Sequence, residues 1–254
     1  MNPHFHRSGT GQPLVFQHGL GGNLEQTRLL LEGLPRTDFL TMDCPGHGKT
    51  PATDPERISF AGFADELLGL CDRLGLDQAV FGGISMGAGL ALHLAAHRPE
   101  RVRALILVRP AWLDQPLPAN LAVLHRLGEL LERGLGESIR NEASFREMND
   151  ENPAAAASVL GQLTREQGEH TARLLLRMCS DRPIDSLREL RRIRIPALIL
   201  ASQDDPLHPF SFGESLRDHL PKARLAEVPS RYRFPEEHQT TVFREVGRFL
   251  DQLG

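Results

Sequence analysis

Short runs rich in apolar residues alternate with amphipathic segments along most of the chain. Each run is only four or five residues long and is bounded by glycine, proline or polar positions, which predicts strands rather than helices. The runs occupy residues 14–17, 39–42, 79–82, 104–108, 197–201 and 224–228. Strands without a regular polar face are typical of a parallel sheet that is covered on both sides.

The segments between these runs carry apolar residues at helical spacing. Between the second and third runs, apolar residues recur three or four positions apart from Phe60 to Leu74. Ser59 can cap the start of this helix, and Gly75 ends the pattern. Similar patterns occupy residues 87–97, 211–220 and the C-terminal end. The alternation predicts an α/β fold, with a mostly parallel sheet and helices on both of its faces.

One region interrupts the alternation of strands and helices. Residues 113–190 carry only helical patterns, with leucine-rich apolar faces. A (β/α)₈ barrel would need strands spread evenly over the chain, so this region argues against that fold. We predict a core of residues 1–112 and 191–254, into which a helical cap of residues 113–190 is inserted.

Charge and hydropathy narrow the range of partners. The 254 residues carry a net charge of -4, which provides no positive field for nucleic acid or for an acidic membrane surface. No apolar stretch is long enough to span a membrane, and the polar N-terminal residues do not resemble a signal peptide. We expect a cytoplasmic protein whose partner is a small-molecule substrate, while the oligomeric state is not indicated.

The three cysteines, Cys44, Cys71 and Cys179, are scattered along the chain. Their spacing fits neither a disulfide framework nor paired zinc ligands, and it suits a reducing compartment. We expect buried thiols and no metal site.

A candidate nucleophile follows the third apolar run. Residues 83–87 read Gly-Ile-Ser-Met-Gly, the pattern G-x-S-x-G, and a helical pattern begins at once. A serine at a sharp turn from strand to helix has a strained backbone, and flanking glycines let the strand and the helix approach closely. Ser85 is therefore the predicted nucleophile.

A glycine-rich turn follows the first apolar run. Residues 18–22 read His-Gly-Leu-Gly-Gly, and such a turn can direct a backbone N–H into a site at the end of a strand. Acyl transfer needs two donors for the developing oxyanion, and we expect the N–H groups of Leu20 and Met86 to supply them. His18 is interpreted as a buried structural histidine that is hydrogen-bonded to the backbone.

These motifs, together with residues 43–48 (Asp-Cys-Pro-Gly-His-Gly) and 205–209 (Asp-Pro-Leu-His-Pro), resemble the α/β-hydrolase superfamily in order and spacing. The resemblance covers nearly the whole chain. It implies a mostly parallel sheet, the serine at a nucleophile elbow, a helical cap after the strand at residues 104–108, and no cofactor. Members with this motif set are commonly esterases, lactonases, thioesterases, epoxide hydrolases or carbon-carbon bond hydrolases.

A serine hydroxyl needs a base and an orienting carboxylate, which follow it in the order Ser, Asp, His in this fold. Asp204 and Asp205 both follow the strand at residues 197–201. Asp205 fits better because a proline-containing turn comes directly after it, as is usual in the family. An exchange of roles with Asp204 stays open.

The base is identified by elimination. After the last strand the family usually has a Gly-His pair, whereas residues 229–234 hold no histidine. His238 is the remaining histidine beyond that strand, so it is predicted to reach Ser85. His208 is set aside because it lies three residues from Asp205, on the wrong loop, and Tyr232 could at most donate a hydrogen bond.

The resulting hypothesis is a serine hydrolase that uses Ser85, His238 and Asp205. Its substrate would be a small to medium, partly apolar ester, lactone, thioester or related carbonyl compound. The missing Gly-His pair keeps an alternative open, because the same fold also hosts lyases and ligand-binding proteins without turnover.

Overall fold

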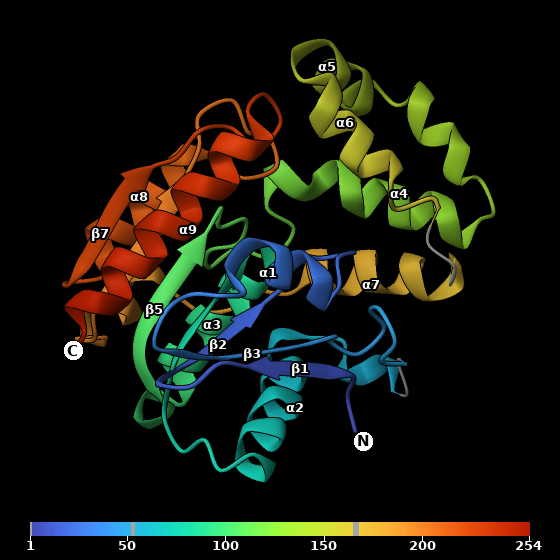
Figure 1. Cartoon of the computed structure of the whole chain (residues 1–254). Coiled ribbons are helices and arrows are strands. Elements are labelled where there is room, and N and C mark those ends of the chain that lie inside the picture. The colour runs from blue at the N-terminus through green and yellow to red at the C-terminus, as the bar shows by residue number, and fades with distance from the viewer. Residues whose placement is uncertain (1, 52–53, 165–167) are drawn as a thin grey trace.

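A seven-stranded sheet forms the centre of the protein (Figure 1). The structure is a computed structural model, and it describes residues 2–51, 54–164 and 168–254. The strands lie in the order β1-β3-β2-β4-β5-β6-β7, and all neighbours are parallel except β1 and β3. Their bounds are β1 Phe5–Ser8, β2 Gln12–Gln17, β3 Thr37–Met42, β4 Ala79–Ile84, β5 Val102–Val108, β6 Ala197–Ala201 and β7 Ala223–Glu227.

The sheet confirms the predicted fold class. Five of the six apolar runs lie within a strand, and the sixth extends one residue beyond β7, to Val228. The apolar pattern did not predict β1, an antiparallel edge strand in which Phe5 is paired with Met42. Its residues, Phe-His-Arg-Ser, are exposed or half-buried, so they show no buried apolar run. This strand forms because β3 offers it a free edge, which is a contact distant in sequence.

Helices cover the sheet in two layers, each with its own hydrophobic core. Residues of α2, α3 and α8 belong to one core, and residues of α1 and α9 belong to the other. The bounds are α1 Leu24–Leu31, α2 Phe60–Arg73, α3 Met86–His97, α8 Phe210–His219 and α9 Pro235–Gln252. None of the helices in the described part of the chain is long and apolar enough to cross a membrane.

The helix between β3 and β4 forms as its sequence pattern predicts. The Ser59 side chain accepts a hydrogen bond of 3.0 Å from the Gly62 N–H, which satisfies one of the free donors at the start of α2. The helix ends at Arg73, two residues before Gly75, whose φ of 70° suits glycine.

Between β5 and β6 the described residues form helices and no strand. We call residues 113–190 the helical segment. In Figure 1, α4, α5 and α6 project beyond the sheet, while α7 runs alongside α4 and returns towards the core. The helices of this segment are η3 Ala119–Leu121, α4 Ala122–Glu132, η4 Gly136–Asn141, α5 Ala143–Glu151, α6 Pro153–Leu160 and α7 Gly168–Ser180, and η5 Leu187–Arg192 crosses its end. Its division from the core as a separate unit stays a prediction.

Trp112 attaches the helical segment to the core. Its indole N–H donates a hydrogen bond of 3.0 Å to the Met178 carbonyl on α7. The same ring packs edge-on against Phe60 at the start of α2, with 5.6 Å between the ring centroids. The residue that ends the core sequence therefore contacts both parts of the molecule.

The turn from β4 to α3 is closely packed. Ser85 has φ 56° and ψ -109°, a left-handed conformation that is unusual for a residue with a side chain. A Cβ on Gly83 would lie 2.4 Å from the Gly87 carbonyl carbon, and a Cβ on Gly87 would lie 2.2 Å from the Gln17 carbonyl oxygen. Both glycines are therefore required by neighbouring backbone, as the motif predicts.

We expect Gly87→Ala to destabilise the protein. Its Cβ would collide with the backbone of β2, which cannot move as a flexible side chain could, so the loss should be about 1–3 kcal/mol or more. Gly69→Ala in α2 is the matched control, because its Cβ would meet nothing closer than Arg73 Nη1 at 3.6 Å. That control should gain up to about 1 kcal/mol from helix propensity. Thermal and urea unfolding of both variants measures the difference, and equal stability would contradict the packing argument.

Candidate active site

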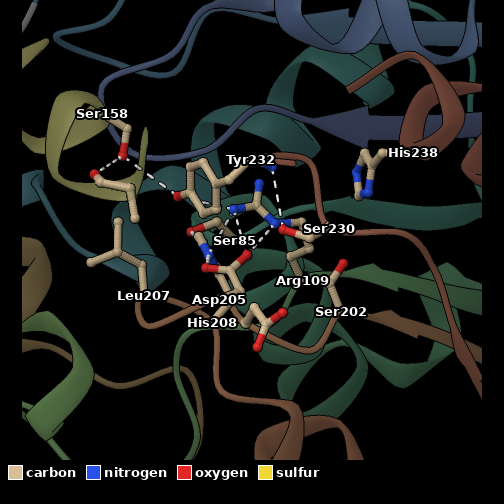
Figure 2. Close-up of polar contacts among 12 residues, drawn as sticks. Ser85, Arg109, Ser158, Ser202, Asp205, Leu207, His208, Ser230, Tyr232 and His238 are labelled. Carbon is tan, nitrogen blue, oxygen red and sulfur yellow. Dashed lines mark hydrogen bonds and ion pairs between the residues drawn. The ribbon is translucent and has the colours of Figure 1, made fainter. Parts of the chain in front are cut away.

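Three polar side chains form a hydrogen-bonded chain at the carboxyl edge of the sheet (Figure 2). The Ser85 hydroxyl oxygen lies 3.0 Å from His208 Nε2, and His208 Nδ1 lies 2.8 Å from Asp205 Oδ1. Ser85 follows β4, while Asp205 and His208 belong to the loop after β6. The imidazole and the carboxylate are both buried. The parallel strands bring these residues together because their carboxyl ends meet at one edge.

A tight turn brings His208 back onto Asp205. The His208 N–H donates to the Asp205 carbonyl at 3.1 Å, and the ring then returns to the carboxylate of the same residue. Two asparagines of the helical segment hold this loop from outside. Asn120 Nδ2 donates to the Leu207 carbonyl at 2.7 Å, and Asn152 Nδ2 donates to the Asp204 carbonyl at 2.8 Å.

His238 does not occupy its predicted place between Ser85 and Asp205, so that arrangement is wrong. Its ring lies in the first turn of α9, away from Ser85 in Figure 2, and its Nδ1 is 2.7 Å from the Pro229 carbonyl oxygen. Burial lowers the pKa of His238 to about 4, so the ring is neutral at pH 7. His208 was set aside because it lies three residues from Asp205, but a turn of that length is enough to bring its ring onto the Asp205 carboxylate.

Asp205, rather than Asp204, contacts the imidazole. The Asp204 side chain is 56% exposed and lies 3.6 Å from Arg233 Nη2. The exchange of roles between the two aspartates is therefore not seen.

Arg109 is a fourth polar residue at this edge, and no sequence motif predicted it. It follows β5, is 2% exposed, and has a φ of 50°. Its Nε donates to Asp205 Oδ2 at 2.7 Å, while its Nη2 lies 3.0 Å from His208 Nδ1 and 3.2 Å from the Tyr232 hydroxyl. A charged residue directly after a fully apolar run was the signal that could have identified it.

These charges set the ionisation of the acid and the imidazole. Burial alone would raise the pKa of Asp205, but the neighbouring His208 and Arg109 outweigh that effect and lower it. Burial lowers the pKa of His208, and the Arg109 charge lowers it further, against the opposing effect of Asp205. The pair is therefore held as a carboxylate beside a neutral imidazole at pH 7.

The two predicted oxyanion donors are the N–H of Met86, directly after Ser85, and the N–H of Leu20, in the turn after β2. Met86 opens α3, so its N–H has no partner within the helix. Leu20 belongs to the turn after β2, where a Cβ on Gly19 would lie 3.4 Å from Ser85 Cβ. Among the described residues, neither the Leu20 nor the Met86 N–H donates to another protein group.

His18 fixes the turn that carries Leu20. Its Nδ1 lies 2.9 Å from the Gly19 carbonyl oxygen, and its Nε2 accepts a hydrogen bond of 3.0 Å from the Cys44 N–H. The ring is completely buried. This agrees with its interpretation as a structural histidine.

A cavity of about 280 Å³ opens above Ser85 and His208. Apolar side chains of Leu20, Trp112 and Leu124 line part of it. Polar groups complete the lining, among them Gln162 of the helical segment and the Arg231 and Tyr232 side chains of the β7–α9 loop. In the described parts of the chain, no group of three or more His, Cys, Asp or Glu side chains could hold a metal ion.

Comparison with known proteins identifies the family of this chain. The model of the alpha/beta hydrolase fold family matches residues 12–234. The chain is 32% identical over 216 residues to "Putative carbamate hydrolase RutD" of Pseudomonas savastanoi pv. phaseolicola, covering 84% of this chain and 83% of that protein. It is 29% identical over 216 residues to 3-oxoadipate enol-lactonase 2 of Acinetobacter baylyi, covering 84% and 78% of the two chains.

Solved structures share the same fold. A thermophilic esterase from Thermogutta terrifontis superposes with a TM-score of 0.77 at 24% identity, covering 98% of this chain and 93% of the esterase. The enol-lactonase from Burkholderia xenovorans LB400 superposes with a TM-score of 0.76 at 22% identity, covering 98% and 96%. The chain is therefore an α/β-fold hydrolase, a member of the alpha/beta hydrolase fold family.

Proposed function

We propose that the protein hydrolyses a small carbonyl compound, an ester, lactone, thioester or related substrate, by covalent acyl transfer through Ser85. The observation that carries the proposal is the chain of hydrogen bonds from Ser85 through His208 to Asp205, at a strained turn that opens into a cavity. In this proposal His208 takes the role that the sequence analysis assigned to His238.

The first half of the reaction forms an acyl-enzyme. His208 Nε2 accepts the Ser85 hydroxyl proton as the oxygen attacks the carbonyl carbon, and the imidazolium then gives that proton to the leaving group. Asp205 accepts from Nδ1–H, which directs the lone pair of Nε2 at Ser85 and stabilises the imidazolium. Water attacks the acyl-enzyme by the same route and restores the serine.

The Leu20 and Met86 N–H groups are the proposed oxyanion donors. Two donors that no other protein group uses can hold the negative oxygen of the tetrahedral intermediate without rearrangement. Met86 also begins α3, so the positive end of the helix dipole lies at the same place.

The cavity supports a small substrate. Ligand pockets usually measure about 300–1,000 Å³, and this one has about 280 Å³ with both apolar and polar lining. The names of two relatives, "Putative carbamate hydrolase RutD" and "3-oxoadipate enol-lactonase 2", refer to a carbamate and a lactone. Both kinds of compound contain a carbonyl carbon that a nucleophile can attack. Since His208 supplies an imidazole, the missing Gly-His pair no longer favours a protein without turnover.

Ser85→Ala should abolish turnover while leaving the fold intact, because loss of the nucleophile costs several powers of ten in rate. Labelling with a fluorophosphonate probe, followed by mass spectrometry of the modified peptide, tests the same residue without knowledge of the substrate. Hydrolysis of short p-nitrophenyl esters by the alanine variant at more than about a tenth of the normal rate would overturn the proposal.

Substitution of His208 and substitution of His238 should have different effects on activity. His208→Gln should lower kcat/KM for a p-nitrophenyl ester by about a thousandfold or more, because no other imidazole lies within hydrogen-bond distance of Ser85 in the described chain. His238→Gln is the matched control and should keep most of the activity, since in the described parts of the chain that ring bonds the Pro229 carbonyl and not Ser85. The reverse pattern would restore His238 as the base.

The charge of Arg109 should shift the pH dependence of kcat/KM. A protonated imidazole cannot accept the serine proton, so kcat/KM falls as the pH drops through the pKa of His208. That pKa is lowered, so the midpoint of the acid limb should lie below about 6.5. Arg109→Gln removes a cation beside the ring, which should move the midpoint to higher pH.

Arg109→Lys, which keeps the charge, is the control for this shift. A thermal unfolding curve of each variant separates a folded protein with a changed pKa from one that has lost its structure. Should the glutamine variant fold and keep the wild-type midpoint, the assigned effect of Arg109 on His208 is wrong.

A further inference from the structure

The cavity above Ser85 carries an excess of positive charge. Arg109 and Arg231 line it, and none of the described residues that line it is Asp or Glu. Asp205 lies behind His208 and is already bonded to Arg109. When the His208 imidazole is neutral, the negative charge of Asp205 and the positive charge of Arg109 cancel. The positive charge of Arg231 then remains uncompensated.

Arg231 differs from its neighbour Arg233 in its surroundings. Arg233 lies 3.6 Å from the Asp204 carboxylate, and it does not line this cavity. Across residues 2–51, 54–164 and 168–254, no ion pair and no hydrogen bond from Arg231 to a protein group is found. Arg231 is an exposed residue and it lines the cavity, so an incoming ligand can meet its side chain.

Both cavity arginines contact the ring of Tyr232. The guanidinium carbon of Arg109 lies 5.2 Å from the centroid of the Tyr232 ring, and that of Arg231 lies 5.5 Å from it. Contact with an aromatic ring orients a guanidinium without neutralising it. Two cations on one ring repel each other, and an anion bound at the mouth would relieve that repulsion.

We infer that Arg231 binds a carboxylate group of the substrate, so that the preferred substrates are small esters, lactones or thioesters that carry one negative charge. This inference rests on the proposed function. The planar guanidinium can form two parallel hydrogen bonds with a carboxylate. One uncompensated positive charge matches a monoanionic group, and the small cavity places that group a few bonds from the carbonyl that Ser85 attacks.

The test compares two esters that differ in charge. Mono-p-nitrophenyl glutarate carries a carboxylate, and p-nitrophenyl pentanoate is its neutral counterpart. The wild type should prefer the glutarate ester by at least about tenfold in kcat/KM, mainly through KM, and the preference should shrink with added salt. Arg231→Gln should lower the ratio of the two kcat/KM values by at least about tenfold, while Arg231→Lys restores part of it.

Arg233→Gln is the matched control, because it removes a nearby arginine that does not line the cavity. Its ratio should equal that of the wild type. Equal preference of the wild type for both esters would overturn the inference, as would an equal loss on both esters in Arg231→Gln.

A binding measurement separates this inference from the proposed function. Glutarate should bind the Ser85→Ala protein in calorimetry, and adding Arg231→Gln should weaken that binding by at least about tenfold. If no ester is hydrolysed but this result is obtained, the proposed function fails and the carboxylate site stands. If esters are hydrolysed but glutarate binds both proteins equally or not at all, the carboxylate site fails alone.

Discussion

The site depends on how a buried carboxylate is compensated. Asp205 is 6% exposed, and a charge so far from water is tolerated only when it is paired and hydrogen-bonded. Oδ1 meets the His208 ring and Oδ2 meets the Arg109 guanidinium. These two contacts fix the imidazole towards Ser85 and connect the ends of β5 and β6. Loss of either partner would leave an uncompensated charge within the protein.

Asp205 contacts both His208 and Arg109, and this sharing weakens the proposed base, His208. A carboxylate that also satisfies Arg109 raises the pKa of the imidazole less than one that serves the imidazole alone. Burial, the Arg109 charge and this sharing together lower the pKa of His208, so the proposed base is weaker but stays neutral at lower pH. The arrangement favours availability of the base over its strength.

Local sequence patterns predicted those features that depend on residues close together in the chain. The six apolar runs, the cap at Ser59 and the glycines around Ser85 all lie in short windows with a steric or hydrogen-bonding reason. β1 and Arg109 escaped because each is stabilised by a distant partner, β3 in one case and Asp205 in the other. His208 was considered as the base but set aside because of its position in the chain. The conformation of the turn from Asp205 to His208, which brings the ring onto the acid, could not be predicted from the sequence.

The hydrogen bonds from Asn120 and Asn152 make the helical segment part of the framework of the candidate site. Both side chains come from this segment, and both hold backbone carbonyls of the loop that carries Asp205 and His208. The same segment also lines the cavity through Leu124 and Gln162. In the proposed mechanism, substrate fit and alignment of His208 are thus mechanically coupled, so this segment is not an interchangeable module. A chimera that took it from another hydrolase would alter the rate constant together with the specificity.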